Sequence, residues 1–213
     1  MCSAGPTAGP NICWSTFRTG IGDRSPLFAA IAAAHDVRTA LYPGSYVDLA
    51  PSTAFPHTTY VDTDDHAARY FADEPLVRSE LAGRTTYATP PRVDFVHADY
   101  TTDLPIEHGS VDLLISLFAG LVSDACRRYL RPSGLLLANS SHGDASVVAL
   151  DPSWRLVAAV QTSAGGFELT DVGLHAYLQP KPGRTKTAEE IRRRGTGVAY
   201  TQSAFAYLFR LGD

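Results

Sequence analysis

The sequence is poor in the residue types that mark several classes of protein. It holds three cysteines in 213 residues. Cys2, Cys13 and Cys126 share no CxxC spacing, so neither a zinc site nor a disulfide framework is indicated. We therefore expect reduced thiols and no metal ion. Charged residues make up only 19% of the chain and hydrophobic residues 45%. That balance predicts a well-filled core and excludes a disordered chain.

Signals for membranes, export and nucleic acid are also missing. No run of about 18 apolar residues is present, and residues 1–22 lack the basic start and apolar stretch of a secretory signal. A net charge of −4 argues against a general nucleic-acid binder. We expect a cytoplasmic protein whose partner is a small molecule, with no nucleic acid and no membrane. Its oligomeric state is left open, with a homodimer as one possibility.

The pattern along the chain predicts one α/β domain over residues 23–213, preceded by an arm over residues 1–22 that is rich in Gly, Pro, Ser and Thr. Short apolar strands alternate with helical segments, which is typical of a doubly wound parallel sheet. Residues 154–160 read as strand or helix. Residues 200–211 alternate with the strand period of two, which predicts an antiparallel edge hairpin. The predicted parallel strands cover residues 37–42, 58–61, 93–97, 111–117 and 135–139.

Polar residues and glycine follow the predicted strands, where such a sheet binds its ligands. Gly44 suits a sharp turn with a ligand close to the backbone. Asp62 follows Gly44 by 18 residues and is placed to bind two ribose hydroxyls. Asp99 is a candidate acceptor for an exocyclic amino group, and Tyr100 for contact with a flat base. Each residue has a structural alternative: Gly44 as a turn glycine, Asp62 as a solvated acid that caps a helix, and Asp99 in an Asx turn.

This order of features resembles the class I S-adenosylmethionine-dependent methyltransferases. The matching segments are Tyr42-Pro43-Gly44-Ser45, Val61-Asp62, Ala98-Asp99-Tyr100, residues 111–116 and residues 130–136. The resemblance implies a Rossmann-like fold with a mostly parallel seven-stranded sheet and an antiparallel C-terminal strand. It also implies S-adenosylmethionine as the cofactor. The implied cofactor-binding residues are Tyr42, Gly44, Ser45, Asp62, Asp99, Tyr100 and Ser116.

The first loop departs from the family, whose loop has an acidic residue followed by alternating glycines. Tyr42 stands at the acidic place, only Gly44 is kept, and Tyr46 and Asp48 stand at later glycine places. Asp48 is a candidate substitute for the missing acid. Two functions therefore stay open. One is methyl transfer to a small-molecule acceptor; the other is a methyltransferase-fold protein that binds a nucleoside ligand or small molecule without methyl transfer, as a non-methylating enzyme or a pseudoenzyme.

Two further segments carry candidate chemistry. His142 and Asp144 follow the fifth predicted strand and are candidate catalytic bases, with a structural loop as the alternative. The neighbouring Ser141 does not make a hydrolase triad, because no G-x-S-x-G elbow is present. Residues 181–194 contain six basic residues and two acids. They suit either a phosphate or acidic substrate, or a solvated loop and helix end.

Overall fold

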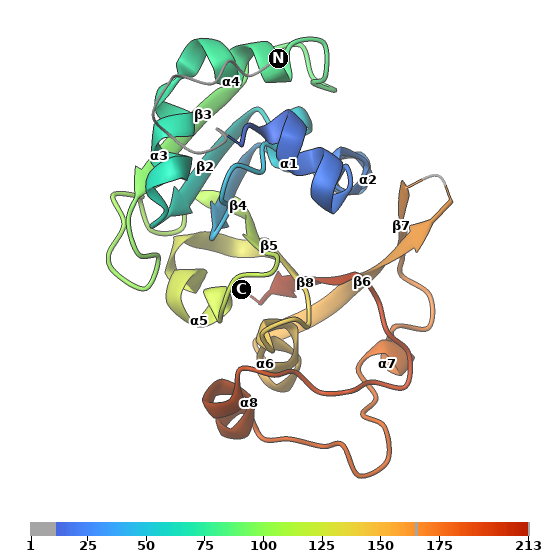
Figure 1. Cartoon of the computed structure of the whole chain (residues 1–213). Helices are drawn as coiled ribbons and strands as arrows, with labels where there is room; N and C mark the ends of the chain where they lie inside the picture. Colours follow the sequence, from blue (N-terminus) through green and yellow to red (C-terminus); the bar gives the residue numbers. More distant parts are fainter. Residues whose placement is uncertain (1–11, 165, 213) are drawn as a thin grey trace.

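The computed structural model describes residues 12–164 and 166–212 as one α/β unit built on an eight-stranded sheet (Figure 1). The strand order is β3-β2-β1-β4-β5-β8-β6-β7. The first five strands pair in parallel, and β8 runs antiparallel between β5 and β6. The strands are β1 (Thr39–Pro43), β2 (His57–Asp62), β3 (Arg92–His97), β4 (Val111–Ser116), β5 (Leu130–Ala138), β6 (Trp154–Ser163), β7 (Gly166–Thr170) and β8 (Ala206–Leu211).

Helices cover both faces of this sheet, because the strand side chains alternate between two apolar clusters. Tyr42 packs on the face covered by α1 to α4, and its neighbour Leu41 packs on the face covered by α5, α6 and α8. The predicted doubly wound α/β fold is thus confirmed. The helices are α1 (Trp14–Ile21), α2 (Ser25–Ala34), α3 (Asp65–Ala72), α4 (Glu74–Leu81), α5 (Val122–Cys126), α6 (Asp144–Leu150), α7 (Leu174–Tyr177) and α8 (Ala188–Arg194), with 3₁₀ turns at Ala50–Thr53 and Arg127–Tyr129.

The prediction of seven strands was wrong by one, because β7 forms an extra hairpin with β6. Gly166, at φ +127°, opens β7 just after the turn, in a backbone region that only glycine enters freely. β8 pairs with both β5 and β6, so it lies inside the sheet and not in an edge hairpin, and the extra strand β7 takes the edge beyond β6. The antiparallel direction predicted for the C-terminal strand is confirmed.

The predicted arm contains more structure than its composition suggested. Residues 1–11 lie outside the described residues, but Trp14–Ile21 of the arm form the helix α1, and Trp14 is buried. The backbone N–H groups of Trp14 and Ser15 donate to the two carboxylate oxygens of Glu80 in α4, at 3.0 and 2.9 Å. A carboxylate at a helix N-terminus satisfies donors that have no partner within the helix. Glu80 therefore fastens α1 to the body of the molecule.

The cysteines differ from the expectation of three reduced thiols. Cys13 is disulfide-bonded, whereas Cys126 is free and buried. Burial raises the pKa of the Cys126 thiol to about 12, so this side chain behaves as a small apolar group. Among the described helices, none is both long and apolar enough to cross a membrane.

Candidate functional site

The strand order reverses between β1 and β4, and the loops that follow these two strands meet at this point. Gly44 follows β1 with φ +66°, and a Cβ added to it would lie 2.7 Å from the Cβ of Ala119 in the loop after β4. Real Cβ atoms do not approach that closely, so the two loops require glycine at this position. The backbone angle and the contact with Ala119 explain Gly44 without a ligand.

Asp62 ends β2 and holds the first loop in place. Its Oδ2 accepts a hydrogen bond from the Tyr46 backbone N–H at 2.7 Å, and its Oδ1 accepts one from the Asp64 N–H at 3.0 Å. Each carboxylate oxygen has two acceptor sites, so one site on each oxygen is still open. Asp62 is half-buried. Its carboxylate is therefore oriented by the backbone and keeps capacity for two hydroxyl groups of a ligand.

On the other side of the first loop, an internal ion pair fills the space beside β1. Asp48 is 1% exposed and accepts hydrogen bonds from Arg24 Nη1 at 3.1 Å, the Tyr42 hydroxyl at 3.4 Å and the Ala50 N–H at 3.1 Å. Burial raises the pKa of Asp48, against the opposing effect of Arg24. Ser45 is buried beside them. Asp48 thus takes part in a closed network and does not face solvent.

Arg24 was not among the residues predicted for the site. It precedes α2, and its guanidinium lies 4.8 Å from the ring centroid of Phe118 in the loop after β4. Phe118 has φ +60°, which is unusual for a bulky residue. Its side chain is also 49% exposed. No local pattern around Arg24 marks it, because its partners Asp48 and Phe118 are 24 and 94 positions away.

The residues after β3 take two different positions. Asp99 is exposed, and its Oδ1 accepts from the Thr101 N–H and the Thr101 hydroxyl, both at 2.8 Å. These bonds lower the pKa of Asp99 and form the Asx turn that was the alternative to a ligand contact. Tyr100 is half-buried, and a Cβ added to Gly120 would lie 2.6 Å from its hydroxyl oxygen. The ring of Tyr100 therefore packs against the loop after β4.

Ser116 and Asp144, predicted for different roles, bind each other. Asp144 is 1% exposed, and its Oδ2 accepts from the Ser116 hydroxyl at 2.5 Å and from the Ser123 N–H at 3.1 Å. The Ser123 hydroxyl donates to the other carboxylate oxygen. Burial raises the pKa of Asp144. This carboxylate joins the end of β4 to the starts of α5 and α6, and it lies away from solvent.

His142 is the one predicted catalytic side chain that is exposed. Its Nδ1 lies 3.0 Å from the Ser141 hydroxyl, which donates to Asn139 Oδ1 at 2.9 Å. Asn139 Oδ1 also accepts from the Phe118 N–H at 3.3 Å. A short chain of polar contacts therefore connects His142 to the loop after β4. In the described part of the chain, no group of three His, Cys, Asp or Glu side chains converges on a metal position.

No family model and no curated protein matches the sequence. Similar solved structures include a methyltransferase from Geobacter sulfurreducens, at 16% identity over 77% of this chain and 90% of that one, with a TM-score of 0.47. The DhpI-SAM-HEP complex is 15% identical over 92% of this chain and 91% of that one, with a TM-score of 0.42. Cofactor-bound Rv0187 from MTB is 13% identical over 70% of this chain and 77% of that one, with a TM-score of 0.48.

The strand order identifies the class of fold. Five parallel strands in the order 3-2-1-4-5, followed by an antiparallel strand inserted before β6, make the Rossmann-like fold of the class I S-adenosylmethionine-dependent methyltransferases. The hairpin strand β7 is an addition at its edge. The first loop of this chain replaces the acid and the later glycines of that fold with Tyr42, Tyr46 and Asp48.

The site fits the two halves of S-adenosylmethionine unequally. The open acceptor sites on Asp62 suit the ribose hydroxyls of the nucleoside half. The amino-acid half finds no glycine cradle, because Gly44 meets Ala119 and Asp48 is held by Arg24. Arg24 keeps N–H donors beyond the Nη1 that binds Asp48, and these suit a carboxylate.

Proposed function

We propose that this chain binds S-adenosylmethionine at the carboxyl end of its sheet and transfers the methyl group to a small-molecule acceptor. The observation that carries the proposal is Asp62. A carboxylate at the end of β2, oriented by two backbone N–H groups and with open acceptor sites, is suited to the paired hydroxyls of a ribose.

The residues around Asp62 take separate tasks in this proposal. Tyr100 and Asp99 lie after the neighbouring strand β3 and flank the base, Asp99 through its Oδ2, because both bonds of its Asx turn go to Oδ1. Arg24 binds the carboxylate of the amino-acid end through its remaining N–H donors. Asp48, Ser116 and Asp144 act through others: Asp48 orients Arg24, and Asp144 fixes Ser116 and the loops beside it.

In methyl transfer the main task of the protein is to align the two reactants. When bound, the cofactor supplies a sulfonium methyl group that is already activated. The protein has to hold the acceptor atom in line with it, and such positioning is the main catalytic contribution. His142 is exposed at the end of β5 and accepts a proton from those acceptors that must lose one. Phe118, exposed beside Arg24, offers an apolar wall to the acceptor.

A second function is favoured by the closed first loop. The contact between Gly44 and Ala119, and the buried pair of Asp48 and Arg24, leave the amino-acid side of the site filled by the protein itself. A chain of this fold that binds only a nucleoside or another small molecule, without methyl transfer, accounts for that filling. The two functions differ in whether the sulfur-bearing half of the cofactor contributes to binding.

Isothermal titration calorimetry separates them. We expect S-adenosylhomocysteine to bind more tightly than adenosine, and the D62N variant to weaken its binding by about 10- to 100-fold through loss of a charged hydrogen-bond acceptor. D65N is the matched control, because Asp65 carries the same charge on the next helix with its side chain 82% exposed. Equal affinities for adenosine and S-adenosylhomocysteine favour the second function. No binding of either ligand at millimolar concentration contradicts both.

A further inference from the structure

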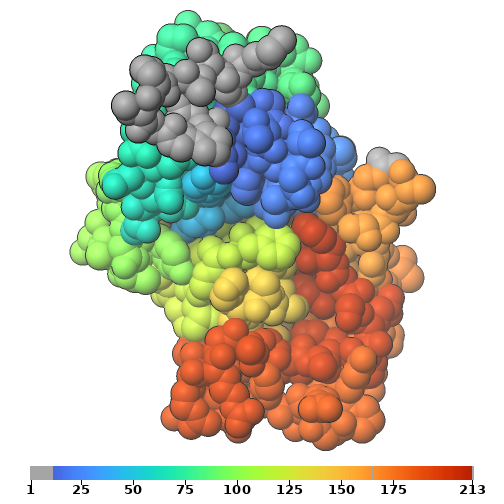
Figure 2. Space-filling model, in the orientation of Figure 1, coloured from blue at the N-terminus to red at the C-terminus, as the bar shows by residue number. Residues whose placement is uncertain are grey.

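A basic pocket lies at the end of the molecule formed by the residues before and within α8, coloured orange to red in Figure 2. It has a volume of about 430 Å³, within the range of small-molecule sites. Four cations and one carboxylate give its lining a formal charge of +3, on a chain whose net charge is −4. The charged lining residues are Lys181, Arg184, Lys186, Glu190 and Arg194.

A tight turn brings two of these cations together. The Arg184 N–H donates to the Lys181 carbonyl at 2.9 Å, and Gly183 between them has φ +69°. Proline and glycine at the two central positions, as in residues 181–184, are the signature of a type II β-turn. The Lys181 N–H donates to the Ala199 carbonyl at 2.8 Å and ties the turn to the far wall. The sequence thus places Lys181 and Arg184 at one mouth of the pocket.

Two of the charged groups are used by the protein itself. Lys186 Nζ donates to the Thr196 carbonyl, the Thr196 hydroxyl and the Gly197 carbonyl, at 3.0, 3.0 and 2.8 Å, which occupies all three of its protons. Glu190 accepts from the Thr187 N–H at 2.8 Å within the capping box of α8. Lys186 therefore builds the wall of the pocket, and the one carboxylate is held at the helix start.

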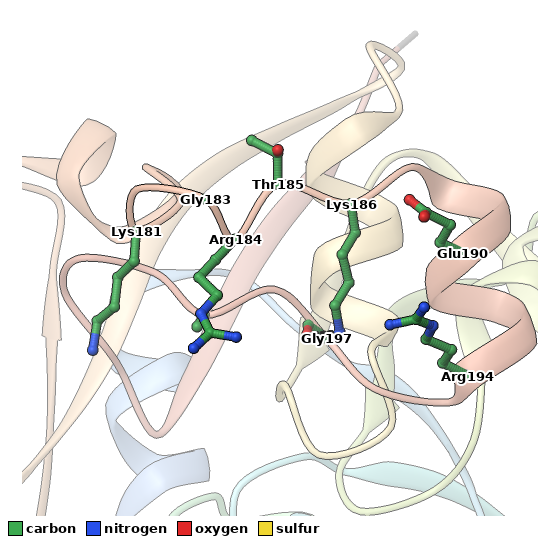
Figure 3. A pocket seen from close by; sticks show the side chains of 9 residues that line it. Lys181, Gly183, Arg184, Thr185, Lys186, Glu190, Arg194 and Gly197 are labelled. Carbon is green, nitrogen blue, oxygen red and sulfur yellow. Dashed lines mark hydrogen bonds between the residues drawn. The ribbon is translucent and has the colours of Figure 1, made fainter.

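The other three cations form no direct ion pair in the described part of the chain, although Arg194 is close enough to Glu190 to help lower the pKa of that carboxyl group. Within residues 12–164 and 166–212, the ion pairs involve none of Lys181, Arg184 and Arg194. By contrast, Arg192 on the same helix pairs with Asp124 at 2.6 Å. Figure 3 shows the Arg194 side chain pointing from α8 toward the end of Lys186, with Arg184 on the far side of Lys186 in the same pocket. Two guanidinium groups facing one space are suited to an anion with several oxygens.

We propose that this pocket binds the phosphate group of a phosphorylated small molecule. Arg184 and Arg194 hold the phosphate oxygens through their N–H donors, and Lys181 adds charge at the mouth. This site is independent of the proposed S-adenosylmethionine site. No residue is shared between the two.

The pocket also adjoins the loop that carries His142. A Cβ on Gly197, which lines the pocket, would lie 3.2 Å from the Ser140 carbonyl oxygen and 3.4 Å from the Cα of Gly143. The Val198 N–H donates to the Ser146 hydroxyl at 2.9 Å. The backbone of residues 197 and 198, which forms one wall of the pocket, is therefore packed directly on the loop between β5 and α6.

The test is calorimetric titration of the full chain with pyrophosphate and inorganic phosphate, without S-adenosylmethionine. We expect pyrophosphate to bind, and the R184A/R194A variant to bind it at least tenfold more weakly. R193A is the control for the effect of charge alone: it removes one positive charge from an exposed position of α8 outside the pocket, where the test variant removes two from its lining. Its affinity is expected to equal that of the parent protein. Unchanged thermal midpoints show that the variants fold.

Three results would overturn the proposal. Pyrophosphate that fails to bind the parent protein removes the site. An equal loss of affinity for pyrophosphate in R193A assigns the binding to the overall positive charge of this surface and not to the pocket. Tight binding of single-stranded RNA that depends equally on Arg192 and Arg193 assigns the surface to nucleic acid. None of these outcomes involves the carboxyl end of the sheet, so each leaves the function proposed for Asp62 to its own test.

Discussion

The carboxylates at the carboxyl end of the sheet fall into two groups, which differ in exposure and in hydrogen bonding. After β2 and β3, Asp62 and Asp99 remain accessible and accept only from nearby loop groups. Beside β1 and β5, Asp48 and Asp144 are each 1% exposed and each accept three hydrogen bonds. The first half keeps open acceptor sites for a ligand. The second half uses its carboxylates to hold the protein together.

The comparison teaches that position after a strand does not by itself assign a binding role. Asp48 and Asp144 both stand where the fold places ligand residues, yet both are enclosed by other side chains. Substitutions on the enclosed half should therefore cost stability first. Substitutions on the accessible half should cost less stability than those on the enclosed half and should weaken ligand binding, as proposed for D62N.

The largest expected effect is that of D48N. The variant leaves the guanidinium of Arg24, whose side chain is 12% exposed, without its carboxylate. We expect a loss of about 3–5 kcal/mol in the free energy of unfolding, measured by urea denaturation. The R24M/D48N double variant should lose less than the sum of the two single variants, because the charges are removed together. A loss below about 1 kcal/mol in D48N would show that the pair is not enclosed.

The G44A variant tests the boundary between the two halves. Its Cβ would meet Ala119 at 2.7 Å, and its φ of +66° is unfavourable for alanine. We expect a loss of about 2–4 kcal/mol in the free energy of unfolding from overpacking and backbone strain. The A119G/G44A variant should recover the overpacking part and keep a loss of about 1–2 kcal/mol. If A119G restores nothing, the two loops do not touch.

A smaller effect with a distinct pH dependence is expected from D144N. Three donors point at Asp144, and the amide satisfies them less well, so we expect a loss of about 1–3 kcal/mol near pH 4. Burial raises the pKa of Asp144 in the folded state, so the folded state holds the proton more tightly than the unfolded state. Its contribution to stability is complete below the unfolded pKa of about 3.9 and falls as the pH rises through the folded pKa.

The difference in stability between the parent protein and D144N should therefore shrink from pH 4 to pH 7, measured by urea denaturation at each pH. S141A is the control, because Ser141 is exposed on the same loop. A difference that grows with pH would mean that the folded state prefers the charged carboxylate.

Much of the fold follows from local pattern in the sequence. Val111–Ser116 is nearly continuous in apolar residues because β4 is buried between two layers of helices. The residues of β8 alternate between the two apolar clusters, which is why its strand period was visible. The extra strand β7 was not predicted, because its half-buried face leaves no clear alternation. Trp14 and its partner Glu80 are 66 positions apart, beyond any local pattern.

The sequence predicted which polar residues lie at the candidate site, but it did not predict their hydrogen-bond partners. Spacing located Asp62 and Asp99 at strand ends. It could not show that Ser123 donates to Asp144 or that Arg24 reaches Asp48, because both pairs depend on packing between distant segments. The roles of His142 and Asp62 toward a ligand stay predictions.

A crystal structure of the chain with S-adenosylhomocysteine tests the central claim most directly. The account predicts the ligand at the carboxyl end of the sheet, with its ribose hydroxyls within hydrogen-bond distance of the Asp62 carboxylate and its amino-acid carboxylate at Arg24. A complex in which the ribose lies away from Asp62, or in which the ligand binds elsewhere on the chain, would contradict it.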